Sequence, residues 1–141
     1  HTDRRQRQMC IRDRFRTLIL DLTFNQNYFE RMIHHEIFHM IDNSFPELFK
    51  KNKWSKLNNK DFSYASCSTC TDLLGLDLEI TKGFLTEYSM STAEEDMAEI
   101  YSLLKTNFKE IDLLIKKDNI LTKKKNFLIN GLKEIDEKFI F

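Results

Sequence analysis

Two histidines and a glutamate have the spacing of a metal-dependent hydrolase. His35, Glu36 and His39 form the pattern His-Glu-x-x-His in a segment with helical periodicity. Residues four apart lie on one face of a helix, so both imidazoles can reach one metal ion. Glu36 then lies beside the metal, where its carboxylate can take a proton from the attacking water and pass it to a leaving group. The pattern therefore predicts a zinc site with Glu36 as general base.

The same pattern has a plainer interpretation, a surface helix whose histidines are solvated or cap neighbouring groups. A third ligand would separate the two interpretations, because a catalytic zinc ion usually takes three protein ligands and leaves the fourth position to water or substrate. The acidic start of a later helix offers four candidates: Glu94, Glu95, Asp96 and Glu99.

The elements that must position these groups follow from the apolar spacing. Residues 15–22 are rich in Leu, Ile and Thr and are predicted to form a short edge strand. The helix of the two histidines follows, capped by Asn25 or Asn27 and stopped before Pro46. Its apolar residues recur at intervals of three and four, as burial of one face requires.

The rest of the chain is predicted to be mostly helical. Residues 47–84 are polar and lysine-rich, and we expect a long ordered loop with short helical turns, followed by an extended segment over 84–90. Ser91 and Glu94 form the Ser-x-x-Glu pattern of a capping box, which predicts a helix over 92–104. Two more helical segments follow, divided near Asp118. Aromatic and apolar anchors of the loop onto the core are expected at Trp54, Leu57, Phe62 and Tyr64.

Composition limits the classes of protein and partner. A chain of 141 residues corresponds to one domain, and its 22 basic and 22 acidic residues balance, so nothing points to a nucleic-acid partner overall. No apolar run is long enough to cross a bilayer, so no membrane span is expected. These residues leave the cellular compartment and the oligomeric state open.

The first fourteen residues differ in composition from the rest. Six of the seven arginines fall within residues 1–16, whereas all fifteen lysines come later. We interpret residues 1–14 as a non-native or disordered segment and residues 15–141 as the functional domain. A basic arm that binds nucleic acid is the competing interpretation.

Cys67 and Cys70 form a lone Cys-x-x-Cys in a Ser/Thr-rich stretch. The pair can be a local disulfide, a redox pair or half of a zinc site. Without a second pair or a strand-helix-strand context, we favour ordinary loop residues.

A second motif is carried by Tyr88 and by the run Glu95-Asp96-Met97-Ala98-Glu99. The tyrosine, six intervening residues and Glu-x-x-Ala-Glu resemble the second active-site element of gluzincin-type metallopeptidases related to the bacterial lethal-factor catalytic domain. The resemblance implies that Glu95 is the third zinc ligand and that the Tyr88 hydroxyl stabilises the tetrahedral oxyanion. It also implies that Glu99 accepts a hydrogen bond from a ligand histidine, and some members have an acidic residue at the position of Asp42, where it can orient a histidine.

The resemblance implies a zincin-like fold, mainly α with a small β remnant near the N-terminus, one Zn²⁺ ion, and a peptide or protein substrate. Complete members have strands and a helix before the metal-binding helix, so we expect this chain to be truncated at its N-terminus. The alternatives to a peptidase are a zinc-binding domain without catalysis and a helical protein-interaction domain without metal.

Overall fold

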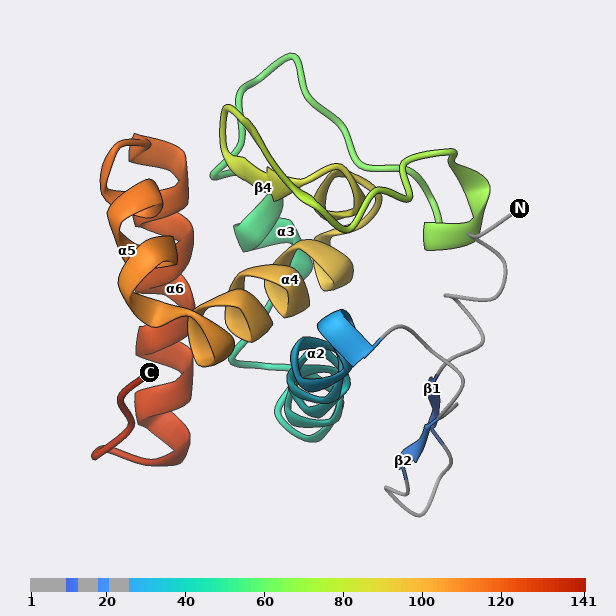
Figure 1. The fold of residues 1–141 in the computed structure, drawn as a ribbon. Coiled ribbons are helices and arrows are strands. Elements are labelled where there is room, and N and C mark those ends of the chain that lie inside the picture. Colours follow the sequence, from blue (N-terminus) through green and yellow to red (C-terminus); the bar gives the residue numbers. More distant parts are fainter. Residues whose placement is uncertain (1–9, 13–17, 21–25) are drawn as a thin grey trace.

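The computed structural model describes residues 10–12, 18–20 and 26–141, with side chains from residue 28 onward. Over these residues the chain is mainly helical, as predicted, with five α-helices and two small antiparallel sheets (Figure 1). Helix α4 (Ala93–Thr106) lies across α2 (Gln26–Ser44), and α5 and α6 pack together beyond it. The crossing of α2 and α4 brings the two predicted motifs together.

Helix α2, Gln26–Ser44, is the predicted helix of the two histidines. Near its end the hydroxyl of Ser44 donates to the backbone carbonyl one turn earlier, at 2.8 Å, two residues before Pro46. Asn27 lies within the first turn and is therefore not the N-cap, contrary to one of the two predictions. The other candidate, Asn25, falls outside the described residues.

The N-terminal sheet agrees with the small β remnant that the sequence predicted. Strand β1 (Cys10–Arg12) pairs in antiparallel fashion with β2 (Leu18–Leu20), which lies inside the predicted strand 15–22. The proposed boundary between a non-native segment and a functional domain after residue 14 stays a prediction.

A second hairpin corrects the expectation for the middle of the chain. Strand β3 (Leu78–Thr81), expected to be loop, pairs with β4 (Phe84–Thr86). Gly83 lies in the connecting turn with a φ of 87°, a backbone conformation that residues with a Cβ atom rarely adopt. The extended segment is also shorter than expected, because a 3₁₀ turn, η2 (Tyr88–Met90), follows β4 directly.

Helix α4 begins one residue later than the capping box predicted. Its N-cap is Thr92, whose hydroxyl accepts from the Glu95 backbone N–H at 3.2 Å. Ser91 instead has helical backbone angles at the end of η2, where its hydroxyl donates to the Tyr88 carbonyl. The cap therefore forms one residue later than predicted, and the Thr92 hydroxyl satisfies an N–H group that the first turn leaves without a helical partner.

The two predicted C-terminal helices are confirmed as α5 (Phe108–Lys116) and α6 (Asn119–Ile135). They are divided where expected, because the Asp118 carboxylate caps α6 by accepting from the N–H groups of Ile120 at 2.8 Å and Leu121 at 3.0 Å. Both helices bury apolar side chains against α4.

The lysine-rich loop is held to the core by the predicted anchors. Trp54, on the short helix α3 (Lys51–Ser55), is fully buried, and Leu57 and Tyr64 pack against the same core. Phe62 lies edge-on to Tyr64, with 5.0 Å between ring centroids. These contacts fix the first part of the loop to the core.

A buried ionic group lies at the centre of this core. Asp96 and Lys124 both have 0% exposure, and their Oδ2 and Nζ atoms lie 2.6 Å apart. The same carboxylate oxygen accepts from Trp54 Nε1 at 2.9 Å and from the Tyr64 hydroxyl. Lys124 also donates to the Gly83 carbonyl at 2.6 Å. The group thus joins α3, α4, α6 and the β3–β4 turn one residue from Glu95.

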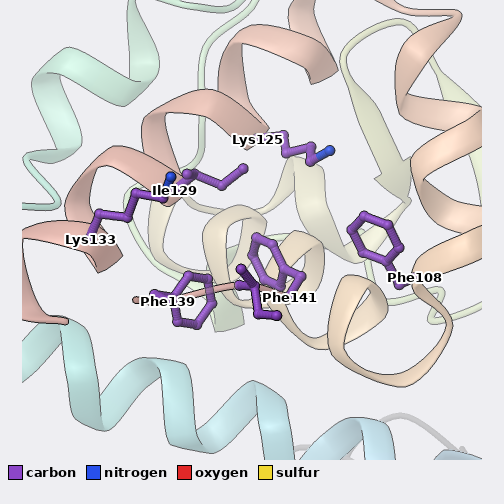
Figure 2. Close-up of a pocket in the computed structure, with 7 residues that line it drawn as sticks. Phe108, Lys125, Ile129, Lys133, Phe139 and Phe141 are labelled. Carbon is purple, nitrogen blue, oxygen red and sulfur yellow. The ribbon is translucent and has the colours of Figure 1, made fainter. Parts of the chain in front are cut away.

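A cavity of about 210 Å³ lies at the C-terminal side of the fold (Figure 2). The cavity is lined by side chains of α5, α6 and the last three residues: Phe108, Lys125, Ile129, Lys133, Phe139, Ile140 and Phe141. The expected metal-binding residues do not line it.

None of the described helices is long and apolar enough to cross a membrane.

Candidate metal centre

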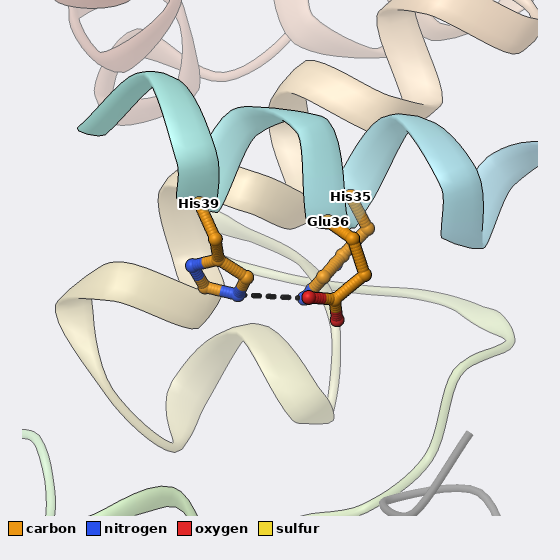
Figure 3. Close-up of side chains that lie close together, drawn as sticks. All are labelled: His35, Glu36 and His39. Atoms are coloured by element: carbon orange, nitrogen blue, oxygen red, sulfur yellow. Dashed lines mark hydrogen bonds between the residues drawn. The ribbon is translucent and has the colours of Figure 1, made fainter. Parts of the chain in front are cut away.

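His35 and His39 project from the same face of α2, one turn apart (Figure 3). Their Nε2 atoms lie 3.1 Å apart, and the rings meet edge to face with 4.8 Å between centroids. Both residues are buried, at 2% and 6% exposure. Two ring nitrogens so close to each other need a shared proton or a shared cation between them.

Glu95 completes a triangle of donor atoms from the first turn of α4. Its Oε2 lies 2.8 Å from His35 Nε2 and 3.2 Å from His39 Nε2. Tetrahedral zinc bound at about 2.0–2.1 Å separates its ligand atoms by about 3.3 Å. Two imidazole nitrogens and one carboxylate oxygen at these separations fit such an ion in both chemistry and size.

The electrostatics of the triangle favour a positive charge at its centre. Burial alone would raise the pKa of Glu95, but hydrogen bonds from His35 and His39 hold it well below its usual range. Burial alone would lower the pKa of His35, but hydrogen bonds to Glu95 and Glu99 raise it to about 10. The lowered pKa keeps the Glu95 carboxylate ionised, and the raised pKa of His35 shows that Glu95 and Glu99 stabilise a positive charge at its imidazole. A metal cation held there in place of a proton would be stabilised in the same way.

Glu99 lies one turn after Glu95 and is fully buried behind His35. Its Oε1 is 2.9 Å from His35 Nδ1, so a proton on Nδ1 can be donated to Glu99 while Nε2 keeps its lone pair. Its Oε2 accepts from the Thr86 hydroxyl at 2.8 Å and from Arg31. The sequence predicted the first of these contacts for Glu99 but neither of the other two.

Glu36 is half-buried beside the two histidines. Its carboxylate and the two imidazoles each offer a ligand atom, and these atoms lie within 4.8 Å of one another. Figure 3 shows the Glu36 side chain extending on the same side of α2 as both rings. This position allows a proton to pass between Glu36 and a molecule held at the triangle.

Tyr88 faces the triangle from η2. Its ring is nearly parallel to the His35 ring, 27° between planes and 6.1 Å between centroids, and its hydroxyl lies near Glu95 and Ser68. Burial, followed by the nearby charge of Glu95, raises the pKa of the Tyr88 hydroxyl. The hydroxyl therefore keeps its proton and acts as a hydrogen-bond donor near neutral pH.

Asp42 does not reach the ligand histidines. It is buried near the end of α2, and both of its carboxylate oxygens accept from Lys51 Nζ, at 2.6 and 2.5 Å. Three residues beyond His39 the helix has turned the side chain toward α3. Among the described residues Asp42 thus tethers α3 rather than orienting a histidine.

The structure gives the four acidic candidates at the start of α4 different environments. Glu95 and Glu99 point to the histidines, Asp96 is buried on the opposite side with Lys124, and Glu94 is partly exposed. The sequence left Asp96 among the four candidate ligands and did not indicate its burial. Lys124, the middle residue of the run Lys123-Lys124-Lys125 in α6, was not recognised as its partner.

Arg31 is the main residue of the site that sequence reasoning missed. It lies one turn before His35, on the face that carries both histidines, and its guanidinium contacts Glu99. A signal was present, because Arg31 is the one arginine that falls after residue 16. Arg31, His35 and His39 follow one another at intervals of four residues, so the helix places Arg31 on the same face as the two histidines.

Cys67 and Cys70 form a disulfide, which corrects the expectation of ordinary loop residues. The 3₁₀ turn η1 (Ser68–Cys70) brings their Cα atoms to 5.1 Å, within the range a disulfide spans. Spacing alone did not reveal this turn. The bridge closes the loop that presents Ser68 to Tyr88.

A known protein family matches most of the chain. Residues 13–141 match the family described as "Putative zinc-binding metallo-peptidase". Neither a curated protein nor a solved structure matches the chain.

Proposed function

Because the chain belongs to this family of zinc-binding metallo-peptidases, we propose that it hydrolyses peptide bonds at a zinc centre held by His35, His39 and Glu95. The observation that carries the proposal is the triangle of ring nitrogens and carboxylate oxygen, with edges of 2.8, 3.1 and 3.2 Å. Three potential ligand atoms that converge on one point in this way are the arrangement that a single zinc ion requires.

The proposal includes a gluzincin-type ligand set. In such a set the third ligand is a glutamate on a second helix, one that also carries a carboxylate behind the first histidine. Glu95 and Glu99 on α4 have this relationship to His35, since they approach its Nε2 and Nδ1 respectively. The resemblance in sequence and the contacts therefore support the same assignment.

Zn²⁺, when bound, makes a water molecule nucleophilic near neutral pH and polarises the carbonyl that is attacked. Glu36 is assigned the proton transfers, because its half-buried carboxylate lies beside the triangle and points toward the same side. It accepts a proton from the attacking water and then delivers it to the nitrogen of the departing amine.

Tyr88 is assigned to the oxyanion. Its hydroxyl lies near Glu95 and keeps its proton, so it can donate a hydrogen bond to the negative oxygen that develops during attack. Glu99 holds His35 in the tautomer whose Nε2 is free to bind metal.

Substitution of Glu36 tests the proposal most directly. We expect Glu36→Gln to retain zinc, measured by elemental analysis, and to lose cleavage of fluorogenic peptides by at least about 100-fold. Glu94→Gln on α4 is the matched control, because it also removes one carboxylate but lies outside the triangle. Peptide cleavage that survives Glu36→Gln unchanged would contradict the mechanism.

Two other outcomes identify the alternatives. A wild-type protein that binds zinc but shows no Glu36-dependent cleavage across a diverse peptide library is a zinc-binding domain without this activity. A folded wild-type protein that binds no zinc under non-chelating conditions rules out both the peptidase and the zinc-binding domain.

A further inference from the structure

Arg31 connects two parts of the site that no single element joins. Its guanidinium uses two different nitrogens, one toward Glu99 Oε2 and the other toward the Leu76 carbonyl at 2.6 Å. Glu99 belongs to α4, whereas Leu76 belongs to the loop before β3. Arg31 itself is buried on α2, so the contacts form away from bulk solvent.

The first contact acts on His35. Glu99 is fully buried and is shared between His35 Nδ1, the Thr86 hydroxyl and Arg31. A buried carboxylate is stable only when donors and a cation compensate its charge. Arg31 supplies a fixed cation on Oε2, which leaves Oε1 directed at His35.

The second contact acts on Tyr88. The loop that carries Leu76 also accepts the Tyr88 backbone N–H at Gly75 O, 2.9 Å away. The neighbouring Glu87 side chain closes the same loop, since its Oε1 accepts from the Leu74 N–H at 2.9 Å. A displacement of residues 74–76 would therefore move the backbone that presents Tyr88 to the triangle.

We propose that Arg31 is a positioning residue of the metal centre, which orients His35 through Glu99 and holds Tyr88 through the loop at Leu76. The inference rests on the proposed function in taking His35 as a metal ligand. A guanidinium presents N–H groups on two separate nitrogens in a fixed planar fork, here one for each acceptor, whereas all N–H groups of a lysine lie on one nitrogen. A lysine at this position keeps the charge but loses the second nitrogen and the fixed geometry that spans Glu99 and Leu76.

The test compares Arg31→Met and Arg31→Lys with wild type and with Glu30→Gln, a control at the adjacent exposed position of α2. Zinc affinity is measured by competition with a chromophoric chelator, and the ligand geometry by the visible absorption of the Co²⁺-substituted full chain. We expect Arg31→Met to lower zinc affinity by about 10- to 100-fold and to alter the cobalt spectrum, as loss of a group that orients a ligand does.

A second measurement tests the other contact without metal. Hydrogen–deuterium exchange of the metal-free proteins should show faster exchange at the Tyr88 and Gly75 amides in both Arg31 variants and no change in Glu30→Gln. Circular dichroism establishes that each variant is folded. If Arg31→Met does not fold, both measurements are made on Arg31→Lys, for which we expect a smaller loss of zinc affinity.

Each contrary result is distinguishable. Folded Arg31 variants with wild-type zinc affinity, cobalt spectrum and amide exchange overturn the positioning role while leaving the peptidase proposal intact. A wild-type protein that binds no zinc overturns both proposals. A wild-type protein that binds zinc but cleaves no peptide overturns the peptidase proposal alone. The positioning role is then still supported by the expected changes in zinc affinity, cobalt spectrum and amide exchange, because none of these measurements depends on turnover.

Discussion

His35 Nε2 and Glu95 Oε2 lie 2.8 Å apart although 60 positions of sequence separate the two residues. The contact exists because α4 crosses α2 at the point where both motifs face inward. It converts a local histidine pair into three converging donor atoms.

Glu95→Gln should remove the one negatively charged ligand of the triangle. We expect zinc affinity to fall by roughly 100-fold or more, beyond the 10- to 100-fold typical of residues behind the ligands. Competition with a chromophoric chelator measures the change, and Glu94→Gln should bind zinc as wild type does. Equal affinities of the Glu95 variant and wild type would remove Glu95 from the ligand set.

Zinc should stabilise the folded protein through these ligands. With free zinc at 100 times its dissociation constant, the free energy of unfolding rises by about 2.7 kcal/mol. For a chain of this size the melting temperature should then rise by an amount on the order of 10 °C. Thermal unfolding with zinc and with excess chelator measures the difference, which should be largely absent in Glu95→Gln.

Tyr88→Phe should separate catalysis from metal binding. Removing one donor to a developing oxyanion typically lowers kcat by about 100- to 1000-fold. Zinc affinity should stay within a few fold of wild type, because Tyr88 is not assigned as a ligand. Tyr101→Phe, in the core beside Phe38, is the control for loss of a tyrosine hydroxyl. A kcat unchanged by Tyr88→Phe would exclude the oxyanion role.

Lys124→Met should leave the Asp96 carboxylate buried without its cation. Breaking a buried pair in this way costs about 3–5 kcal/mol of folding free energy. Urea unfolding near pH 7.5 should show this loss, whereas Lys123→Met, at the exposed neighbouring position, should change stability by less than about 0.5 kcal/mol. A loss as small as that of the control would mean that the pair contributes little.

The same variant should show a defined pH dependence. Burial raises the pKa of Asp96 even beside Lys124, and removal of Lys124 raises it further. A carboxyl group with a raised folded-state pKa binds more protons in the native state than in the unfolded state, so stability increases as pH falls toward the unfolded pKa. The deficit of Lys124→Met relative to wild type should therefore shrink between pH 8 and pH 5, and a deficit that grows over this range contradicts the assignment.

Much of the fold was accessible from local patterns. The apolar spacing of α2, the acidic start of α4 and the aspartate that caps α6 predicted these helices, because capping and amphipathic spacing depend on neighbours within one turn. The position of the α4 N-cap was predicted one residue too early. Thr92 rather than Ser91 caps α4, since both residue types suit an N-cap and tertiary packing selects between them.

The histidine pair was determined by sequence alone, because residues four apart on a helix meet whatever the rest of the chain does. Nothing local specifies which acidic side of α4 faces it. That choice depends on the core, in which Asp96 turns inward to Lys124 and thereby directs Glu95 and Glu99 to His35. Arg31 and Thr86 became part of the site only through contacts between elements, both with Glu99. The sequence by itself therefore determined the reactive groups, and the packing of α4 on α2 decided which of them meet, since long-range contacts follow from burial of whole faces rather than from spacing along one helix.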